Sequence, residues 1–474
     1  MKRLVFCGIL SVIFFFSTEA QHRSITWQKF NDVGPRLKQL GKLTTESSNE
    51  IASSMWSIGC ETLDRDYASF DNYKQYLAEL GVKSARLQSG WAKCEPEKGK
   101  YEFTWLDNCV YGLDELGIKP WICLCYGNPL YGADKVLGSK IFTDDTAINA
   151  WLKYVKATVT RYKNVVNEWE IWNEPNLGAN IEFAQSYADL LMRTTEVIKK
   201  IQPEAIIIGI SLAGTTNSFT KDVFEILKSN NKADIMDYMT YHPYVHNPDA
   251  AVEEIKALKE LAQSYDPTIK LFQGEVGCPS ILEWGHALSY YEWTEYSQVK
   301  WNLRQMINHW SMGVRYNVFT FVDLQYPNML QSFGLLRMNL LKEFVYKRPS
   351  YYAVQHTVNI LDSTVSQAGR LSYKANTFRD IAVHGIKKDN TYGAILWFSD
   401  RIPSDDLSWD KIDITIENLK LFNPVYVDMI TGKVYEIPSY NRKVIANDTK
   451  FNDIPIWDSP ILIVERSQIS FKQI

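Results

Sequence analysis

Short apolar runs alternate with longer amphipathic stretches from about residue 50 to residue 350. The runs have strand length and are rich in β-branched and aromatic residues, whereas the stretches between them repeat apolar positions at helical spacing. The pattern predicts eight strands: Ser54–Cys60, Val82–Leu87, Lys119–Cys125, Val166–Trp172, Ala205–Ile210, Met236–His242, Lys270–Glu275 and Arg315–Phe321. It predicts helices between them, including Phe70–Leu80, Trp105–Leu116, Ala147–Tyr162, Phe183–Lys200, Val252–Tyr265 and Glu295–Met312.

Eight successive β-then-α units are typical of an α/β chain folded as a closed (β/α)₈ TIM barrel. The alternative is an open doubly wound sheet, which would usually carry a glycine-rich phosphate turn after its first strand. No G-x-G-x-x-G pattern stands there. We therefore expect a barrel over residues 51–362.

The pattern changes beyond Pro349, which is expected in the first turn of a last barrel helix, Ser350–Leu361. Short strand-like runs then follow one another, separated by turn residues. These runs are Leu371–Phe378, Ile381–Ile386, Tyr392–Phe398, Leu419–Phe422, Val425–Met429, Val434–Ile437 and Ile461–Glu465. They predict a C-terminal β-sandwich domain over residues 363–474. Residues 21–50 show no clear period and are expected to pack on the barrel or the β domain.

Residues 1–20 resemble a secretory signal peptide, because Lys2 and Arg3 precede an apolar run, Leu4–Phe16, that ends near small residues. That run is short for a membrane span, so we expect cleavage, with an uncleaved anchor as the alternative. No later segment is apolar enough to cross a bilayer. The expected location is periplasmic or secreted.

Composition excludes some functions. The net charge of −4 comes without a basic stripe, so nothing indicates a nucleic-acid partner. Aromatic residues make up 13%, with 15 Trp and 27 Tyr, which suits either core packing or binding of sugar rings. No cofactor motif is present.

Six cysteines follow the signal segment: Cys60, Cys94, Cys109, Cys123, Cys125 and Cys278. They could pair in an exported protein, but the sequence does not determine the connectivity. Cys123 and Cys125 share one face of a predicted strand and are interpreted as buried thiols in preference to a zinc site.

Two glutamates stand where predicted strands end. Glu174 precedes Pro175, which has no N–H to extend a ladder, and Glu275 lies between Gly274 and Gly277. The two fall on the fourth and seventh strands, whose carboxyl ends meet at the catalytic face of a TIM barrel. A carboxyl pair of this kind cleaves glycosidic bonds, so we predict Glu174 as acid/base and Glu275 as nucleophile, about 5–5.5 Å apart for retention of configuration.

A nucleophilic carboxylate needs donors that keep it ionised. Arg86, near the end of the second strand, and Tyr244, just past the sixth, are the expected donors to Glu275. Glu170 has the same strand parity as Glu174 and would point inward below it, so it is expected to pair with Arg86 as a structural carboxylate.

Further substrate-binding candidates follow the strand ends. Asn173 is expected to bond a sugar hydroxyl, the 2-OH being favoured, while a role for His242 as a substrate contact competes with a structural one. Because no carboxylate or cysteine cluster accompanies His246, no metal is predicted. The remaining candidates for lining the cleft are Trp91, Tyr126, Asn128 and Trp284.

Several motifs together resemble those of clan A glycoside hydrolases, most of all family 39, the β-xylosidase and α-L-iduronidase family. They lie between about residues 50 and 355: Ala85-Arg86-Leu87-Gln88 with Trp91, Gly117-Ile118-Lys119-Pro120, Trp172-Asn173-Glu174-Pro175-Asn176, His242-Pro243-Tyr244, Glu275 with Gly277, and Phe333-Gly334-Leu335-Leu336-Arg337 with Tyr351-Tyr352-Ala353.

The resemblance implies a barrel beside a β-sandwich, retention of configuration, and the same roles for Glu174 and Glu275. One position departs from the pattern, because Tyr126 follows strand three where such enzymes often offer a histidine, so xylose is not carried over as the substrate. The sequence thus predicts an exo-acting β-glycosidase for a plant or microbial oligosaccharide or polysaccharide. The alternatives are an endo-acting glycanase similar to families 5 or 30, a non-catalytic polysaccharide-binding barrel and, less favoured, a phosphate-binding barrel enzyme.

Overall fold

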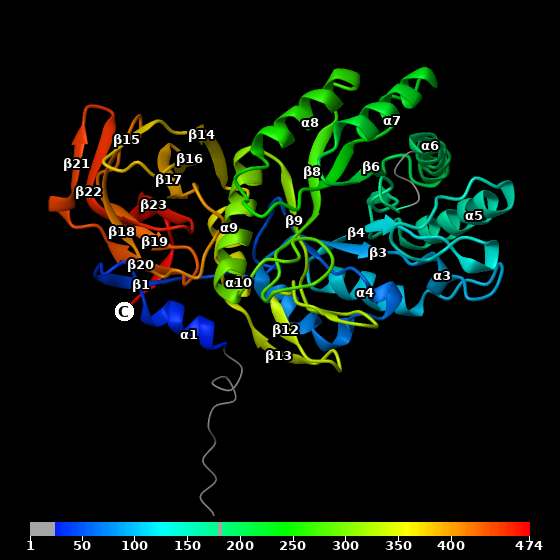
Figure 1. Cartoon of the computed structure of the whole chain (residues 1–474), viewed down its shortest axis with the longest axis horizontal. Coiled ribbons are helices and arrows are strands. Elements are labelled where there is room, and N and C mark those ends of the chain that lie inside the picture. Colours follow the sequence, from blue (N-terminus) through cyan, green and yellow to red (C-terminus); the bar gives the residue numbers. More distant parts are fainter. Residues whose placement is uncertain (1–23, 179–182) are drawn as a thin grey trace, which may run out of the picture.

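A closed barrel of eight parallel strands forms the centre of the computed structural model, which describes residues 24–178 and 183–474 (Figure 1). Each strand pairs with the next, and the last pairs with the first. The strands are β2 (Trp56–Gly59), β3 (Ser84–Gln88), β4 (Lys119–Leu124), β5 (Glu168–Ile171), β6 (Ile206–Ala213), β7 (Tyr238–His242), β8 (Lys270–Val276) and β9 (Arg315–Val318). The predicted (β/α)₈ barrel is confirmed.

Helices cover the outside of this barrel (Figure 1). They are α4 (Thr104–Glu115), α5 (Asp145–Tyr162), α6 (Ala184–Ile201), α7 (Asn217–Ser229), α8 (Val252–Tyr265), α9 (Glu295–Ser311) and α10 (Pro349–Ile360). Their ends follow local chemistry: the Asp144 side chain accepts from the Ala147 N–H at the start of α5, and Pro349 opens α10.

The helix predicted at Phe70–Leu80 is wrong in most of its length. Two 3₁₀ turns, Phe70–Asn72 and Lys74–Tyr76, precede a single α-turn, α2 (Leu77–Leu80), which ends at Gly81 with φ +85°. Between the 3₁₀ turns, Tyr73 leaves helical geometry with φ −134°. Its fully buried ring packs against Phe70 and Phe321, so tertiary packing overrides the helical pattern here.

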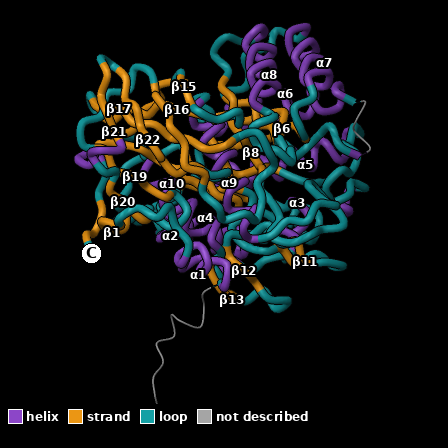
Figure 2. Tube along the Cα trace, turned by 60° about the vertical axis from the view of Figure 1, so that its left-hand side comes forward, coloured by secondary structure: helices purple, strands orange, loops and turns teal. Residues whose placement is uncertain are grey.

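Two antiparallel sheets form the C-terminal sandwich (Figure 2). The larger has the order β14-β16-β17-β23-β19-β20-β1-β24 and the smaller β15-β18-β22-β21. Their strands are β1 (Gln39–Leu43), β14 (Val365–Arg370), β15 (Tyr373–Ala375), β16 (Ile381–Lys388), β17 (Thr391–Phe398), β18 (Asp410–Ile416), β19 (Pro424–Asp428), β20 (Lys433–Glu436), β21 (Arg442–Ile445), β22 (Asp448–Ile456), β23 (Ile461–Glu465) and β24 (Phe471–Gln473).

One predicted strand of this domain, Leu419–Phe422, is a loop. Leu419 and Leu421 are buried because the loop folds over the sandwich, whereas Phe422 is exposed. Buried and exposed positions alternate along this loop as they do along a strand, but the loop pairs with no neighbouring strand. The strand that pairs in this region is β18, which the sequence analysis did not single out.

The segment before the barrel belongs to the C-terminal sheet. Helix α1 (Ile25–Asp32) begins at Ser24, whose side chain caps the Trp27 N–H, and the Trp27 ring stacks on Tyr352 of α10 at 4.1 Å. Strand β1 then pairs antiparallel with β20 on one side and β24 on the other. The sandwich therefore contains strands from both sides of the barrel in the sequence.

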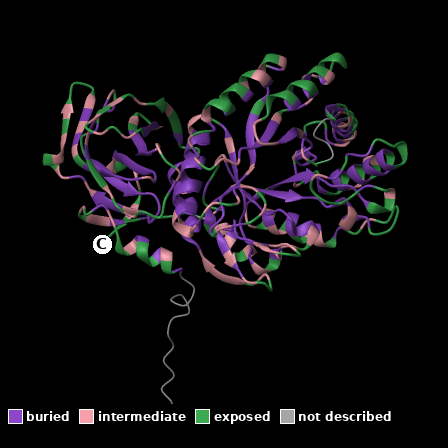
Figure 3. Cartoon of the chain, in the orientation of Figure 1, coloured by how far each residue is buried: buried purple, intermediate pink, exposed green. Residues whose placement is uncertain are grey.

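Helix α9 joins the barrel to the sandwich. It is buried along almost its whole length (Figure 3). Lys300 forms an ion pair with Asp458 of the sandwich at 2.6 Å, and Arg304 donates to the Ser399 carbonyl. Buried polar groups are costly without partners, and for Lys300 and Arg304 of this helix the sandwich supplies a partner.

In residues 24–178 and 183–474, no helix has both the length and the hydropathy to cross a bilayer. The predicted signal peptide lies outside the described residues. The six cysteines after it are free, buried thiols. Burial raises the pKa of Cys60, Cys123 and Cys278 well above the usual thiol value.

Candidate active site

Glu174 and Glu275 meet at the carboxyl ends of the barrel strands. Glu174 follows β5 and Glu275 lies in β8; one carboxylate oxygen of each and a ring nitrogen of His242 all lie within 4.8 Å of one another. Trp172 and Glu174 have φ +69° and +50°, and the Glu174 N–H donates to the carbonyl of Ser211, which lies within β6. The chain thus leaves strand geometry at once after β5 and turns Glu174 into the mouth, at a cost in backbone strain that is typical of functional sites.

Two donors hold Glu275. The Tyr244 hydroxyl donates to Oε1 at 3.1 Å, and Arg86 Nη1 donates to Oε2 at 2.7 Å. Burial opposes ionisation of Glu275, but His242, Arg86 and the Tyr244 hydroxyl together outweigh it and hold its pKa below the usual value. The environment of Glu275 therefore favours a carboxylate over a carboxylic acid at neutral pH.

Arg86 connects Glu275 to the interior of the barrel. Its Nε and Nη2 donate to Glu170 Oε2 at 2.9 and 2.5 Å, and Nη2 also donates to Asn173 Oδ1 at 2.7 Å. The Thr240 hydroxyl donates to the other oxygen of Glu170 at 2.5 Å. Because Arg86 and Glu170 are fully buried, these contacts fix the guanidinium, and Glu170 has the position expected for it.

His242 is the partner of Glu174. Its Nδ1 lies 2.7 Å from Glu174 Oε1, and the ring is fully buried. Gly274 makes room for it, because a Cβ at that position would lie 2.9 Å from Thr240 Cβ and 3.4 Å from His242 Nε2. A Cβ at Gly277 would lie 1.5 Å from the Phe319 carbonyl oxygen. The glycines on both sides of Glu275 thus permit the close backbone approach that the sequence indicated.

Asn173 and Tyr126 form a second pair beside the carboxylates. Asn173 Nδ2 donates to the Tyr126 hydroxyl at 2.9 Å while Oδ1 accepts from Arg86, so both ends of the amide are oriented. The second N–H of Nδ2 is left for a further acceptor. Burial raises the pKa of Tyr126 well above its usual value, which keeps the phenol protonated.

Trp91, Asn128 and Trp284 have contacts to other partners. The Trp91 ring, in α3 (Trp91–Cys94), is fully buried and its Nε1 donates to Glu95 Oε2 at 2.6 Å. Asn128 accepts from the Leu130 N–H and donates to the Glu95 carbonyl, which makes it a turn cap. Trp284 is 71% exposed, with Tyr290 at 6.0 Å, on the loop after β8.

Sequence reasoning missed Glu61, which lies two residues beyond the end of β2 and is 2% exposed. Its Oε1 lies 3.5 Å from Arg86 Nη1. It also missed Gln88 at the end of β3, which accepts from Arg65, whose guanidinium in turn lies over the Tyr126 ring. Position at a strand end, the rule that found Glu174 and Glu275, would have found Glu61 and Gln88 as well.

Glu174, His242 and Glu275 are the one group in the described residues whose oxygen and nitrogen atoms lie close enough together to ligate a metal ion. Arg86 already places a positive charge 2.7 Å from Glu275. A cation there would be repelled by the guanidinium, so the donor set fits a metal poorly.

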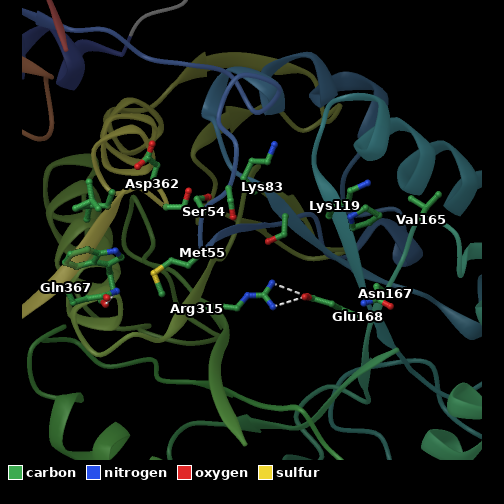
Figure 4. Close-up of a pocket in the computed structure, with 17 residues that line it drawn as sticks. Ser54, Met55, Lys83, Lys119, Val165, Asn167, Glu168, Arg315, Asp362 and Gln367 are labelled. Atoms are coloured by element: carbon green, nitrogen blue, oxygen red, sulfur yellow. Dashed lines mark hydrogen bonds and ion pairs between the residues drawn. The ribbon is translucent and has the colours of Figure 1, made fainter. Parts of the chain in front are cut away.

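A cavity of about 560 Å³ lies at the opposite end of the barrel (Figure 4). Ser54, Lys83, Lys119 and Arg315 line it at the amino ends of their strands, and Arg315 forms a two-pronged ion pair with Glu168 at 2.9 and 3.0 Å. In TIM barrels this end contributes stability, whereas chemistry takes place at the other. The cavity is therefore separate from the candidate active site.

Residues 86–280 match the model of glycosyl hydrolases family 39. Among curated proteins, an aryl-phospho-beta-D-glucosidase of Bacillus subtilis is 22% identical over 218 residues, which is 42% of this chain and 43% of that protein. The chain therefore spans less than half the length of that relative.

Solved structures share the fold. A family 39 glycoside hydrolase from Bacteroides cellulosilyticus WH2 is similar with a TM-score of 0.65 and 17% identity, over 87% of this chain and 81% of that one. A monomeric beta-xylosidase from Caulobacter crescentus CB15 is similar with a TM-score of 0.56 and 16% identity, over 90% and 98% of the two chains.

Proposed function

Because the chain is a glycosidase most similar to glycoside hydrolase family 39, we propose that it cleaves β-linked, equatorial glycosidic bonds with retention of configuration. Glu174 is the proposed acid/base and Glu275 the proposed nucleophile. The observation that carries the proposal is the approach of their carboxylate oxygens to within 4.8 Å. Retaining enzymes separate the two groups by about 5–5.5 Å, whereas inverting enzymes need about 6.5–9.5 Å to admit water.

The first step is attack by Glu275 on the anomeric carbon while Glu174 protonates the departing oxygen. Arg86 and Tyr244 keep Glu275 ionised and point its oxygens toward the cleft. The second N–H of Asn173 Nδ2 is placed to bond a hydroxyl of the sugar, and Tyr126 and Arg86 fix the amide that offers it.

The second step reverses the roles of the two carboxyls. Once Glu275 is bonded to the sugar it carries no charge, and Glu174, now a carboxylate, takes a proton from the water that attacks the anomeric carbon. His242, 2.7 Å from Glu174, holds that carboxyl in place through both protonation states. A ring that can donate or accept suits a partner that alternates between acid and base.

Paired variants test this assignment on an aryl β-glycoside identified by screening. Glu275→Ala should lose at least about 10⁴-fold in kcat, with turnover restored by azide as a β-to-α inverted glycosyl azide. Glu174→Gln should keep the first step on substrates with good leaving groups while losing activity on alkyl glycosides. Activity near that of the wild type in either variant would contradict the assignment.

We infer exo action from the end of a plant or microbial glycan as the mode of cleavage. The sizes of products released from an oligosaccharide series test it, because an exo enzyme releases one unit at a time. Internal cuts early in the reaction would favour the endo alternative, for which the exposed Trp284 and Tyr290 would offer a longer binding surface.

Export to the periplasm or the outside is part of the proposal. It is supported by Lys2, Arg3 and the apolar run Leu4–Phe16 in the sequence. The amino-terminal residue of the protein recovered from the periplasm or medium is expected to be Gln21, and recovery of uncleaved protein in the membrane fraction would count against it.

A further inference from the structure

A fourth carboxyl group, that of Glu61, lies in the site beside those of Glu174, Glu275 and Glu170. Glu61 Oε1 is 3.5 Å from Arg86 Nη1 and accepts from Asn317 Nδ2 at 3.3 Å, and Oε2 is 3.5 Å from the Thr320 hydroxyl. At 2% exposed, it is buried beneath the mouth of the barrel. The reaction proposed above gives it no role.

The charges around Arg86 do not balance if every carboxyl is ionised. One guanidinium contacts Glu170 at 2.5 Å, Glu275 at 2.7 Å and Glu61 at 3.5 Å. Burying two uncompensated negative charges together is far more costly than protonating one group. Glu61 has the longest contact with Arg86, so it is the member of the set that takes up the proton.

The other titratable groups that face Glu61 do not change this excess of negative charge. They are Arg86 on β3, Glu275 on β8, Tyr244 after β7, Tyr73 before α2, and the neighbouring Cys60. Burial keeps the pKa values of the two phenols and the thiol well above the usual range, so these three are neutral. Burial raises the pKa of Glu61 to about 8, against the opposing attraction of Arg86 and with a further rise from Glu275.

The backbone is shaped around this carboxyl. A Cβ at Gly59, the last residue of β2, would lie 2.1 Å from Glu61 Oε2 and 2.8 Å from Oε1. The side chain of Glu61 therefore folds back over the end of its own strand, and only glycine at position 59 leaves space for it.

We propose that Glu61 is a positioning residue for the nucleophile. As a neutral carboxylic acid it holds Arg86 Nη1 and the Asn317 amide beside Glu275 without competing for the positive charge, so that Arg86 serves Glu170 and Glu275 alone. This inference rests on the proposed function, since it takes Glu275 as the nucleophile.

Two substitutions at Glu61 separate a neutral positioning group from a charged one. Glu61→Gln keeps the shape and the acceptor, and should retain kcat/KM on the aryl β-glycoside within about threefold, with the acid limb of its pH profile unmoved. Glu61→Leu removes the acceptor and should lower kcat about tenfold or more with little change in KM. A fall in Glu61→Gln as large as in Glu61→Leu would overturn the proposal.

The pH profile adds a readout that a purely structural role would not move. If Glu61 were ionised, replacing it with glutamine would remove a like charge next to Glu275 and shift the acid limb down by about one unit or more. That shift would overturn the assignment of a neutral acid, as would a Glu61→Leu enzyme with wild-type kcat.

Gly59→Ala tests whether the position of the Glu61 carboxyl matters, without replacing Glu61 itself. The added methyl should displace the Glu61 carboxyl and lower kcat, whereas the control Gly285→Ala, where an added Cβ meets nothing within 4 Å, should behave as the wild type. Unchanged kcat in Gly59→Ala would contradict the proposal. These outcomes are separate from the proposed function, because that fails only if Glu275→Ala or Glu174→Gln stays active.

Discussion

Each end of the barrel holds an arginine, fully buried at the mouth and partly buried at the base, and the charges around the two differ. At the base, Arg315 meets one carboxylate, Glu168, through two parallel bonds at 2.9 and 3.0 Å, and its guanidinium lies 4.2 Å from the Phe272 ring. At the mouth, Arg86 meets Glu170, Glu275 and Glu61. The first arrangement is neutral and closed, whereas the second has more carboxyl groups than cations.

That excess distinguishes the end that holds the candidate active site from the opposite end. A matched ion pair at the edge of solvent contributes modest stability, and both of its groups can stay charged without binding or losing a proton. An unmatched set must bind a proton somewhere, so its members differ in protonation at a single pH, which acid–base chemistry requires. The following substitutions test the contrast in order of expected effect.

Arg86→Lys should have the largest effect. Lysine keeps the charge but cannot reach Glu170, Asn173 and Glu275 at once, because it lacks the planar fork of arginine. We expect kcat/KM to fall about 100-fold or more, measured with the aryl glycoside, while the melting temperature falls by much less. A fall in stability without a fall in kcat/KM would place Arg86 with the structural pair at the base.

Arg315→Met should do the opposite at the base of the barrel. It leaves the partly exposed Glu168 without its partner and should lower the free energy of unfolding by about 1–2 kcal/mol, with kcat/KM unchanged within about twofold. Denaturant unfolding measures the loss. The double variant Arg315→Met with Glu168→Gln is the control and should recover part of the stability, because no charge is then left alone.

Tyr126→Phe should have a smaller effect at the mouth. It removes the acceptor that orients Asn173 Nδ2, a loss worth about 1 kcal/mol, so we expect kcat/KM to fall about fivefold. Tyr131→Phe, which removes a hydroxyl bonded to Glu95 away from the carboxylates, provides the comparison and should leave kcat/KM unchanged. Equal effects of the two would mean that Tyr126 does not act through Asn173.

Glu283→Gln should have the smallest effect, on the pH dependence of stability. Burial raises the pKa of Glu283, on the loop after β8, to about 7, against the opposing bond from the Ser332 N–H. Between about pH 4.3 and pH 7 the folded state holds a proton that the unfolded chain has lost. Stability from this group is therefore complete below that window and is lost as the pH rises through 7.

The melting temperature of the wild type should accordingly fall by roughly 2 °C more between pH 5 and pH 8 than that of Glu283→Gln. Scanning calorimetry at several pH values measures this difference. Parallel curves for the two proteins would show that Glu283 does not bind a proton in the folded state over this range.

The positions of the barrel strands, and of Glu174 and Glu275 at the ends of two of them, could be predicted from the sequence because each depends on the local pattern of residues. Parallel barrel strands are buried on both faces and appear as apolar runs, and the residues that follow them must gather at one rim. The helix expected at Phe70–Leu80 failed because the burial of Tyr73 depends on Phe321, about 250 residues away.

Residues whose roles depend on distant contacts were harder to predict. Trp91 and Asn128 follow strands just as Tyr126 does, yet both serve Glu95, and nothing in the local pattern distinguishes them from a ligand contact. The position of Glu61 near the end of β2 follows the same strand-end rule as Glu174 and Glu275, but its contact with Arg86 beside Glu275 is known only from the fold.

The order of assembly follows from the position of β1 between β20 and β24. Residues 39–43 are synthesised first among the strands of that sheet, and about 430 further residues must follow before both neighbouring strands exist. A fragment that starts at residue 363 would lack this strand and leave β24 with no partner. Attempts to produce the sandwich alone should therefore attach residues 24–43 to it through a linker, so that the sheet can close.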